Sequence, residues 1–231
     1  MAPAKVMLIR HAEKPDGTGN VMGVSESGRP DPRQLSVRGW QRAGALVRFF
    51  APAGGNFADG IATPSAIFAC KPYGAANSVR PFSTVTPLAA LLGIAVNHQI
   101  GKHDIAALLD AVETSSGTVL ICWSHKLMAS ILRGLAGGAA GLPDEWPAGR
   151  FDLVWVLDRA GAGWSFCEVG QLLLPGDAHP AGRRPTFGFC GNQQTKGFIA
   201  GFEAYWGRQF QKYGRSEVAP KPPPADDRCT G

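Results

Sequence analysis

Short apolar runs alternate along this chain with longer segments whose apolar residues recur at helical spacing. Each short run has the length of a β-strand and ends abruptly in polar residues. A Gly-Ala-Gly turn at 161–163 separates the last two runs, which favours a hairpin there. The predicted strands are Val6–Ile9, Ala66–Cys70, Ile94–Val96, Thr118–Trp123, Phe151–Leu157 and Trp164–Val169, the last of them continuing through Gln171–Leu174.

The helical segments carry recognisable boundary residues. Ser36 is placed to cap a helix whose apolar residues run from Trp40 to Phe50. Pro81 suits the first turn of a second helix, which stops at Gly93. Two further helices are expected over Ile105–Val112 and through Leu127 to Leu135, the latter directly after the clearest strand.

Strand and helix in alternation predict a three-layer α/β/α sandwich with a mostly parallel central sheet. Its length of 231 residues is enough for one sizeable domain, which we expect over residues 1–178. Residues 179–218 would form a C-terminal extension packed on that domain, with one amphipathic helix around Phe198–Phe210. Residues 219–231 contain four prolines and are expected to be a disordered tail.

Composition points toward an anionic ligand. The formal net charge is +5 and the sequence pI is near 9.1. The lysines and arginines are scattered, and no nucleic-acid-binding motif accompanies them, so we do not expect a nucleic-acid partner. No apolar run approaches the length of a membrane span.

The five cysteines form no Cys-x-x-Cys pair and no zinc-ligand spacing, so no zinc site is expected. An odd number of cysteines favours reduced thiols in a cytosolic protein. Residues 1–5 lead directly into the first strand, whose four apolar residues are too few for the core of a signal peptide. We therefore predict a cytoplasmic protein.

Polar residues with phosphate chemistry come directly after three of the predicted strands. Arg10 and His11 end the first, Lys71 follows the second, and Ser124 with His125 ends the fourth. Because ligands of an open parallel sheet bind outside the carboxyl ends of its strands, these side chains should share one edge. Arg80 reaches the same edge from the start of the second helix.

Two histidines and two arginines suit a phosphoryl group in transfer. Such a group spreads negative charge over its oxygens, so catalysis depends on positioning and charge stabilisation. Each arginine offers a planar fork of donors that stays charged. A neutral imidazole is a competent nucleophile near pH 7, and a carbonyl on its other nitrogen could fix its tautomer.

Four segments of the sequence resemble motifs of the histidine phosphatase superfamily, also called phosphoglycerate-mutase-like. Leu8–Pro15 (LIRHAEKP) is similar to its Arg-His signature, and Leu35–Ala43 (LSVRGWQRA) to the Leu-Thr-x-x-Gly-x-x-Gln-Ala stretch that comes next. Ser78–Leu88 (SVRPFSTVTPL) resembles the Arg-x-x-x-Thr segment, and Leu120–His125 (LICWSH) occupies the place of the second histidine. The resemblance covers roughly residues 5–175, with the motifs in family order.

The resemblance implies a phosphoglycerate-mutase-like fold and a phosphatase with His11 as nucleophile, Arg10, Arg80 and His125 in the phosphate pocket, and no metal or organic cofactor. The sequence departs from the family where Arg-His-Gly reads Arg-His-Ala and where Ser-His-Lys replaces Gly-His-Gly around His125. The chain has little room for long active-site insertions, which favours a hydrolase over a phosphoglycerate-type mutase. A catalytically weak phospho-ligand-binding module is the alternative from another class.

The sequence leaves two candidates for the residue that donates a proton to the leaving oxygen. The family takes it from a carboxylate between the second arginine and the second histidine, where Asp104 is best placed. An N-cap of the following helix is an equally weighted interpretation of Asp104. Glu13, two residues after the nucleophile, is the other candidate. Lys14 is expected to contact the phosphate, with a solvated surface charge as the alternative.

The substrate is either a phosphorylated small molecule or a phosphoprotein, and the sequence favours neither. Specificity should come from the loop over Asp16–Arg33 and from the segment after Gly176, which carry no readable motif. Oligomeric state leaves no signal in the sequence.

Overall fold

The computed structural model describes residues 2–74, 78–137 and 141–180. These residues form a six-stranded sheet in the order β3-β2-β4-β1-β5-β6, with four helices. The strands are β1 (Lys5–Arg10), β2 (Ala66–Ala69), β3 (Val96–Asn97), β4 (Thr118–Trp123), β5 (Leu153–Ala160) and β6 (Gly163–Gly170). The helices are α1 (Val37–Phe50), α2 (Val79–Leu92), α3 (Ile105–Glu113) and α4 (His125–Ala136).

The sheet is parallel from β3 to β1 and antiparallel from β1 to β6. Crossover helices join the parallel strands, whereas β5 and β6 form the predicted hairpin. In the centre, β1 and β4 pair residue for residue, from Lys5 opposite Thr118 to Arg10 opposite Trp123. Both strands therefore end at the same level, and the residues after them emerge side by side.

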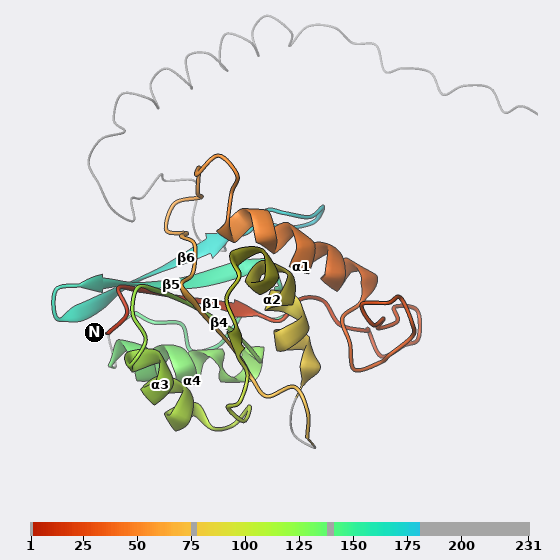
Figure 1. Cartoon of the computed structure of the whole chain (residues 1–231), viewed down its shortest axis with the longest axis horizontal. Helices are drawn as coiled ribbons and strands as arrows, with labels where there is room; N and C mark the ends of the chain where they lie inside the picture. The colour runs from red at the N-terminus through yellow and green to blue at the C-terminus, as the bar shows by residue number, and fades with distance from the viewer. Residues whose placement is uncertain (1, 75–77, 138–140, 181–231) are drawn as a thin grey trace, which may run out of the picture. The chain divides into compact units, whose positions relative to one another are not determined.

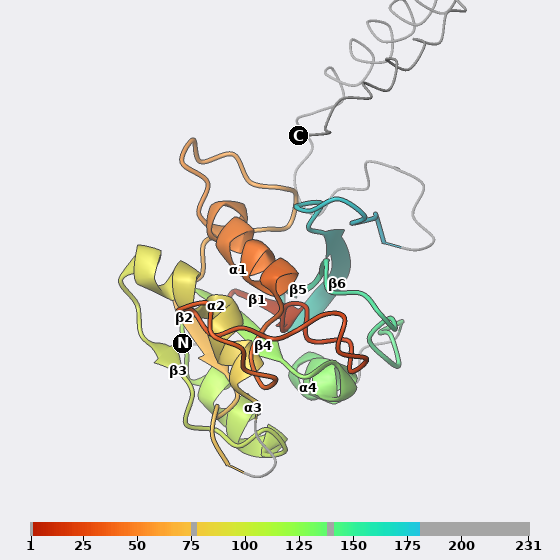
Figure 2. The ribbon, with the colours of Figure 1, turned by 90° about the vertical axis from the view of Figure 1, so that its right-hand side faces the viewer.

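Helices cover both faces of the sheet, which confirms the predicted three-layer α/β architecture (Figure 1 and Figure 2). Alternate side chains of each strand enter opposite cores because neighbouring residues of a strand point to opposite faces. Val6 and Leu8 of β1 pack in the core with α3 and α4. Met7 and Ile9 pack in the other core, with α1 and α2.

Helix boundaries coincide closely with the capping residues. Ser36 caps α1, its hydroxyl accepting the Gly39 N–H at 3.1 Å. Helix α2 begins at Val79, so Pro81 lies in its first turn, where its missing N–H costs no helical hydrogen bond. Helix α2 ends at Gly93 with a φ of 66°, a left-handed cap that favours glycine.

Two strand predictions need correction. The third strand lies at Val96–Asn97 and is shorter than and shifted from the expected Ile94–Val96. The expected continuation through Gln171–Leu174 is wrong, because β6 ends at Gly170 and Leu172 has a φ of 53°. Gln171 instead turns inward, and its amide donates to the Leu153 carbonyl at 3.1 Å.

The C-terminal predictions lie outside the described residues. These are the extension beyond residue 180, the helix around Phe198–Phe210 and the tail over 219–231. No helix in the described ranges is long and apolar enough to cross a membrane.

Candidate active site

His11 directly follows β1 and is almost fully buried, with 6% of its surface exposed. Its backbone N–H donates to the Trp123 carbonyl at 3.2 Å, which ties it to the end of β4. Its Nδ1 lies 2.8 Å from the Ala12 carbonyl oxygen. Because a carbonyl can only accept, Nδ1 carries the proton, and Nε2 keeps its lone pair for another task.

Burial is the main reason that the pKa of His11 falls to about 3. The carbonyl of Ala12 opposes this shift, while Arg10, Arg80 and His125 add to it. The ring is therefore neutral at physiological pH, as a nitrogen nucleophile must be. The same interactions show that all three predicted partners lie within electrostatic reach of His11.

Arg10 projects from the last position of β1 and is 5% exposed. Its guanidinium lies over the Phe151 ring, 3.8 Å from the centroid, and Nη1 donates to the Arg150 carbonyl at 3.2 Å. Burial lowers the pKa of Arg10 to about 10, against the charge of Glu13, so it remains a cation. Its Nε is buried and has no hydrogen-bond partner in the described part of the chain.

His125 opens α4 immediately after β4, and its Nδ1 is likewise buried and unpartnered among the described residues. Burial is the first cause of its lowered pKa, followed by the charge of Arg10, then those of Lys126, Lys14 and Lys102. A buried polar atom without a partner costs free energy, so two of them beside a cationic set indicate a site built for a ligand. An anion would satisfy both Arg10 Nε and a protonated His125 Nδ1.

Arg80 lies in the first turn of α2 and is oriented by the loop that precedes α1. Its Nε donates to the Gln34 carbonyl at 3.2 Å, and Nη2 donates to the Pro32 carbonyl at 3.0 Å. Burial lowers the pKa of Arg80, with Asp31 acting in the opposite direction. These two backbone carbonyls thus orient the Arg80 guanidinium, which keeps its positive charge.

Thr84 joins the segment that carries His11 to α2, a contact that the sequence did not reveal. It is fully buried, and its hydroxyl accepts the Ala12 N–H at 2.9 Å while donating to the Arg80 carbonyl at 2.8 Å. One side chain therefore sets the distance between the residue after His11 and the turn that carries Arg80. The signal that could have identified it is its place in the Arg-x-x-x-Thr segment, four residues after Arg80, on the same face of the helix.

Glu13 forms part of an ion network and is not open to the phosphate set. Its carboxylate accepts from Arg42 Nε and Nη2, the latter at 2.7 Å, and from Arg38 at 3.2 Å. Arg42, 2% exposed, also binds the carboxylate of Asp177 at 2.7 Å. No sequence pattern indicated this network, because Arg42 and Asp177 are 135 residues apart.

The two remaining predicted residues differ in position. Lys14 is exposed but lies within electrostatic reach of His125, whose pKa it lowers. Asp104 is exposed and caps α3, its carboxylate accepting the Ala107 N–H at 3.3 Å. The structure thus brings His11, Arg10, Arg80 and His125 together with Lys14 at their edge, whereas Asp104 takes the capping position.

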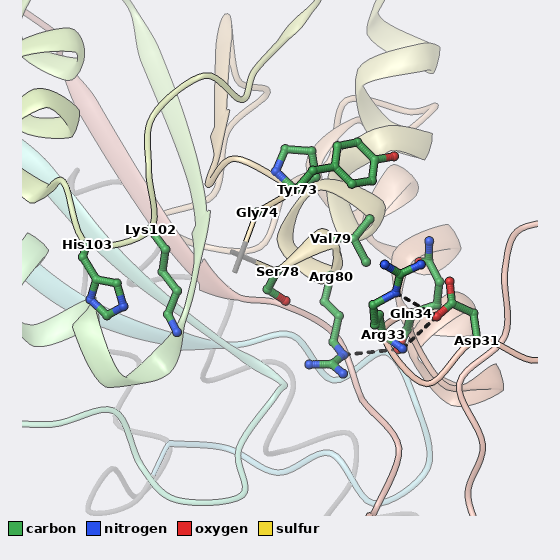
Figure 3. Close-up of a pocket in the computed structure, with 11 residues that line it drawn as sticks. Asp31, Arg33, Gln34, Tyr73, Gly74, Ser78, Val79, Arg80, Lys102 and His103 are labelled. Atoms are coloured by element: carbon green, nitrogen blue, oxygen red, sulfur yellow. Dashed lines mark hydrogen bonds and ion pairs between the residues drawn. The ribbon is translucent and has the colours of Figure 1, made fainter. Parts of the chain in front are cut away.

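A cavity of about 680 Å³ opens beside Arg80 (Figure 3). Its walls come from the loop before α1, the segment after β2, the first turn of α2 and the loop between β3 and α3. Lys102 and His103 lie on one side of Arg80 and Asp31 and Gln34 on the other (Figure 3). Within the described ranges no group of three or more His, Cys, Asp or Glu side chains is arranged to hold a metal ion.

No family model and no curated protein matches the sequence. Solved structures do align with the chain. SixA of Agrobacterium tumefaciens, provisionally named a phosphohistidine phosphatase, is 19% identical, with 71% of this chain and 96% of that chain covered and a TM-score of 0.43. YhfR of Bacillus stearothermophilus is 13% identical, with 70% and 94% covered and a TM-score of 0.44.

A third structure is an Escherichia coli K-12 protein provisionally named an α-ribazole-5′-P phosphatase. It is 11% identical, with 73% of this chain and 96% of that chain covered and a TM-score of 0.46. The first and third of these proteins carry provisional phosphatase names, and the second carries none. At these identities and TM-scores, the chemistry of this chain has to be inferred from its own residues.

Proposed function

We propose that this chain is a metal-independent phosphomonoester hydrolase that forms a covalent phosphohistidine on His11. One observation carries the proposal: the imidazole of His11 is buried, its Nδ1 lies 2.8 Å from the Ala12 carbonyl oxygen, and two arginines and a second histidine lie within electrostatic reach of it. The unpartnered Arg10 Nε and His125 Nδ1, both within the described residues, support it, because an anion is the ligand that both could bind.

In the first step, the Nε2 lone pair of His11 attacks the phosphorus atom of the ester. A phosphorus–nitrogen bond forms, the bond to the leaving oxygen breaks, and that oxygen takes up a proton. Arg10, Arg80 and the N–H of His125 stabilise the negative charge on the equatorial oxygens. The hydrogen bond from Nδ1 to the Ala12 carbonyl stabilises the positive charge that the ring acquires.

In the second step, water attacks the phosphohistidine. The phosphorus–nitrogen bond breaks, inorganic phosphate forms, and the electron pair returns to His11 Nε2. The water proton passes to the group that protonated the leaving oxygen, so the enzyme regains its initial state. A histidine intermediate therefore needs no metal to split one displacement into two easier ones.

We assign the proton donor to Asp104. Its neighbour His103 lines the cavity beside Arg80, so the start of α3 adjoins the leaving-group side. As an acid, Asp104 would carry its proton on Oδ2, because Oδ1 accepts the Ala107 N–H that it caps, at 3.3 Å. Glu13 is the weaker candidate because its carboxylate is bound to Arg42 and Arg38.

Turnover of p-nitrophenyl phosphate in the presence of EDTA tests the proposal. Wild type should turn over and His11→Ala should not, while His179→Ala, the removal of an exposed histidine, should behave as wild type. Slow turnover by Asp104→Asn would support the acid assignment. Loss of all turnover on addition of EDTA, or full turnover by His11→Ala, would contradict the mechanism.

A phosphoglycerate-type mutase would instead retain the phosphoryl group on a diphosphorylated intermediate. A phospho-ligand-binding module would bind phosphate without releasing product. A monophosphate ester with a second, free hydroxyl reveals the first outcome, and a phosphate-binding measurement reveals the second. We further infer that the substrate is a phosphorylated molecule and that the protein acts in the cytoplasm, as the sequence predicts.

A further inference from the structure

The guanidinium of Arg10 is held in place by uncharged groups. The ring of Phe151 covers it at 3.8 Å from the ring centroid, and the Arg150 carbonyl accepts from Nη1 at 3.2 Å. Glu13, whose negative charge reaches Arg10, is already bound to Arg42. Neither of the two contacts brings a negative charge, so the guanidinium keeps its charge for an anion.

An aromatic ring can hold an arginine without occupying its hydrogen-bond donors. The face of the ring attracts a cation, and the attraction is stronger where water is excluded, as it is around the 5% exposed Arg10. A ring stacked on the flat guanidinium limits its rotation but leaves the N–H groups, which lie in its plane, for hydrogen bonds. The buried Nε of Arg10 is one of those groups, and it has no partner among the described residues.

Phe151 is itself fixed by contacts of the residues on either side of it in the sequence. The Arg150 carbonyl also accepts from Trp146 Nε1 at 2.9 Å, so Trp146 and Arg10 share one acceptor. The guanidinium of Arg150 binds the Asp152 carboxylate, with Nε 2.6 Å from Oδ1. Because Trp146 and Asp152 are both buried, the segment before β5 holds the ring of Phe151 in a defined position.

The same ring also lies beside His11. The ring centroids of Phe151 and His11 are 6.0 Å apart, with an angle of 56° between the ring planes. Phe151 therefore neighbours both the last residue of β1, Arg10, and the imidazole that follows it. A shift of the ring would move the guanidinium relative to the imidazole, and reaction rates fall steeply when catalytic groups are misplaced by about 1 Å.

We propose that Phe151 is a positioning residue of the phosphate site, whose ring holds the Arg10 guanidinium in the orientation that presents Nε to the phosphoryl group beside His11. This role rests on the function proposed above and adds to it a residue that acts through Arg10. It accounts for two observations together: a buried cation is covered by an aromatic ring, and its Nε has no partner within the described ranges.

Four variants test the proposal with p-nitrophenyl phosphate: Phe151→Leu, Phe151→Tyr, Arg10→Met, and Phe151→Leu combined with Arg10→Met. Phe151→Leu keeps an apolar side chain but removes the ring, and kcat/KM should fall roughly tenfold or more, the size of a desolvated cation–π contact. Phe151→Tyr keeps the ring and should remain near wild type. In the Arg10→Met background, Phe151→Leu should have little further effect, because the ring acts through Arg10.

Phe166→Leu is the matched control. Phe166 is also a half-buried phenylalanine, and it packs edge-on against Trp155, outside the phosphate set. Its replacement should cost stability but leave kcat/KM near wild type. A loss in Phe151→Leu that is equally large with and without Arg10 would overturn the proposal, and so would equal kcat/KM in the Leu and Tyr variants of Phe151. If Arg10→Met retains too little activity to measure, the second comparison decides.

A further arm covers an inactive wild type. If folded wild type hydrolyses no ester, the proposed function fails, but calorimetric titration with inorganic phosphate still tests the positioning of Arg10. Phosphate that binds more weakly to Phe151→Leu than to Phe151→Tyr and Phe166→Leu would uphold the proposal. Equal affinities in the three variants, or a folded wild type that binds no phosphate, would overturn it.

Discussion

Replacing Arg42 with methionine should destabilise the protein strongly, although Arg42 does not belong to the phosphate set. Arg42 is 2% exposed and holds two carboxylates, Glu13 and Asp177, whose side chains are 12% and 3% exposed. A third acceptor, the side-chain oxygen of Gln171, lies 2.9 Å from Nη1. Methionine fills a similar volume but leaves two poorly hydrated negative charges beside each other.

The expected loss is about 3–5 kcal/mol in the free energy of unfolding at pH 7, the cost of removing one partner from a buried ion pair. Most of this cost is the buried negative charge that remains, with the 43% exposed Arg38 as the cation still beside it. A triple variant, Glu13→Gln, Arg42→Met and Asp177→Asn, should therefore be more stable than Arg42→Met alone. Asp177 also accepts the backbone N–H groups of Leu173 and Leu174, which limits the recovery.

Activity should fall along with stability because the network supports the segment that carries His11, the proposed nucleophile. The Glu13 carbonyl accepts the Ser36 N–H at 2.9 Å, so the residues after His11 are fixed to the start of α1. Guanidinium chloride unfolding monitored by circular dichroism gives the free energies, and kcat of the folded fraction gives the effect on positioning. Arg38→Met, which removes a 43% exposed partner of Glu13, is the control and should cost below about 1 kcal/mol.

A loss below about 1 kcal/mol in Arg42→Met, or a triple variant less stable than the single one, would refute the reasoning. The first result would mean that water enters and solvates the carboxylates. The second would mean that the network contributes net attraction beyond the desolvation of its charges.

The contacts around the nucleophile support three other predictions. Thr84→Val should lower the free energy of unfolding by about 1–3 kcal/mol, because it leaves the buried N–H of Ala12 unpaired. It should also lower kcat with little change in KM, whereas Thr84→Ser should keep both stability and kcat near wild type. Chemical unfolding and steady-state kinetics measure these effects. Gly39→Ala should destabilise the helix start, because a Cβ there would clash with the Glu13 carbonyl oxygen, and a thermal melt of this variant beside Gly44→Ala, which meets no neighbour, measures the effect. The pKa of His11 is 6.5 in the unfolded chain and about 3 in the folded protein, so the unfolded chain binds the proton more readily and stability rises with pH across this range. Between pH 7 and pH 5, the free energy of unfolding should therefore fall by about 2 kcal/mol more in wild type than in His11→Gln. Equal losses in the two proteins would contradict the lowered pKa.

The architecture, and the common edge at which the candidate phosphate residues lie, could be predicted from the sequence for the same physical reason. Apolar runs that end at Arg10 and Trp123 are strong local signals, and parallel pairing of neighbouring strands then brings the residues after them to one edge. The order of the strands and of the residues after them was therefore enough to predict that Arg10, His11 and His125 lie close together.

The parts that the sequence did not reveal depend on contacts between distant segments. The Arg42 network joins α1 to a loop 135 residues away, and no local pattern distinguishes Arg42 from an exposed helical arginine. The segment after β6 resembles a strand because Leu172, Leu173 and Leu174 are apolar. In the structure, however, its polar groups form other hydrogen bonds than those of a strand: the Gln171 amide donates to the Leu153 carbonyl, and the Leu173 N–H donates to the Asp177 carboxylate. For Asp104, both interpretations were open from the sequence, and the structure shows the capping hydrogen bond.

The most direct measurement of the central claim is a rapid-quench trap of the phosphoenzyme. Wild type mixed with a ³²P-labelled phosphomonoester and quenched in alkali should carry label that is stable to base and labile to acid, as a phosphohistidine is. Peptide mapping should locate that label on His11, and His11→Gln should carry none. Label on another residue, or rapid hydrolysis with no trapped phosphoenzyme in a wild type whose His11→Gln variant remains active, would contradict the account.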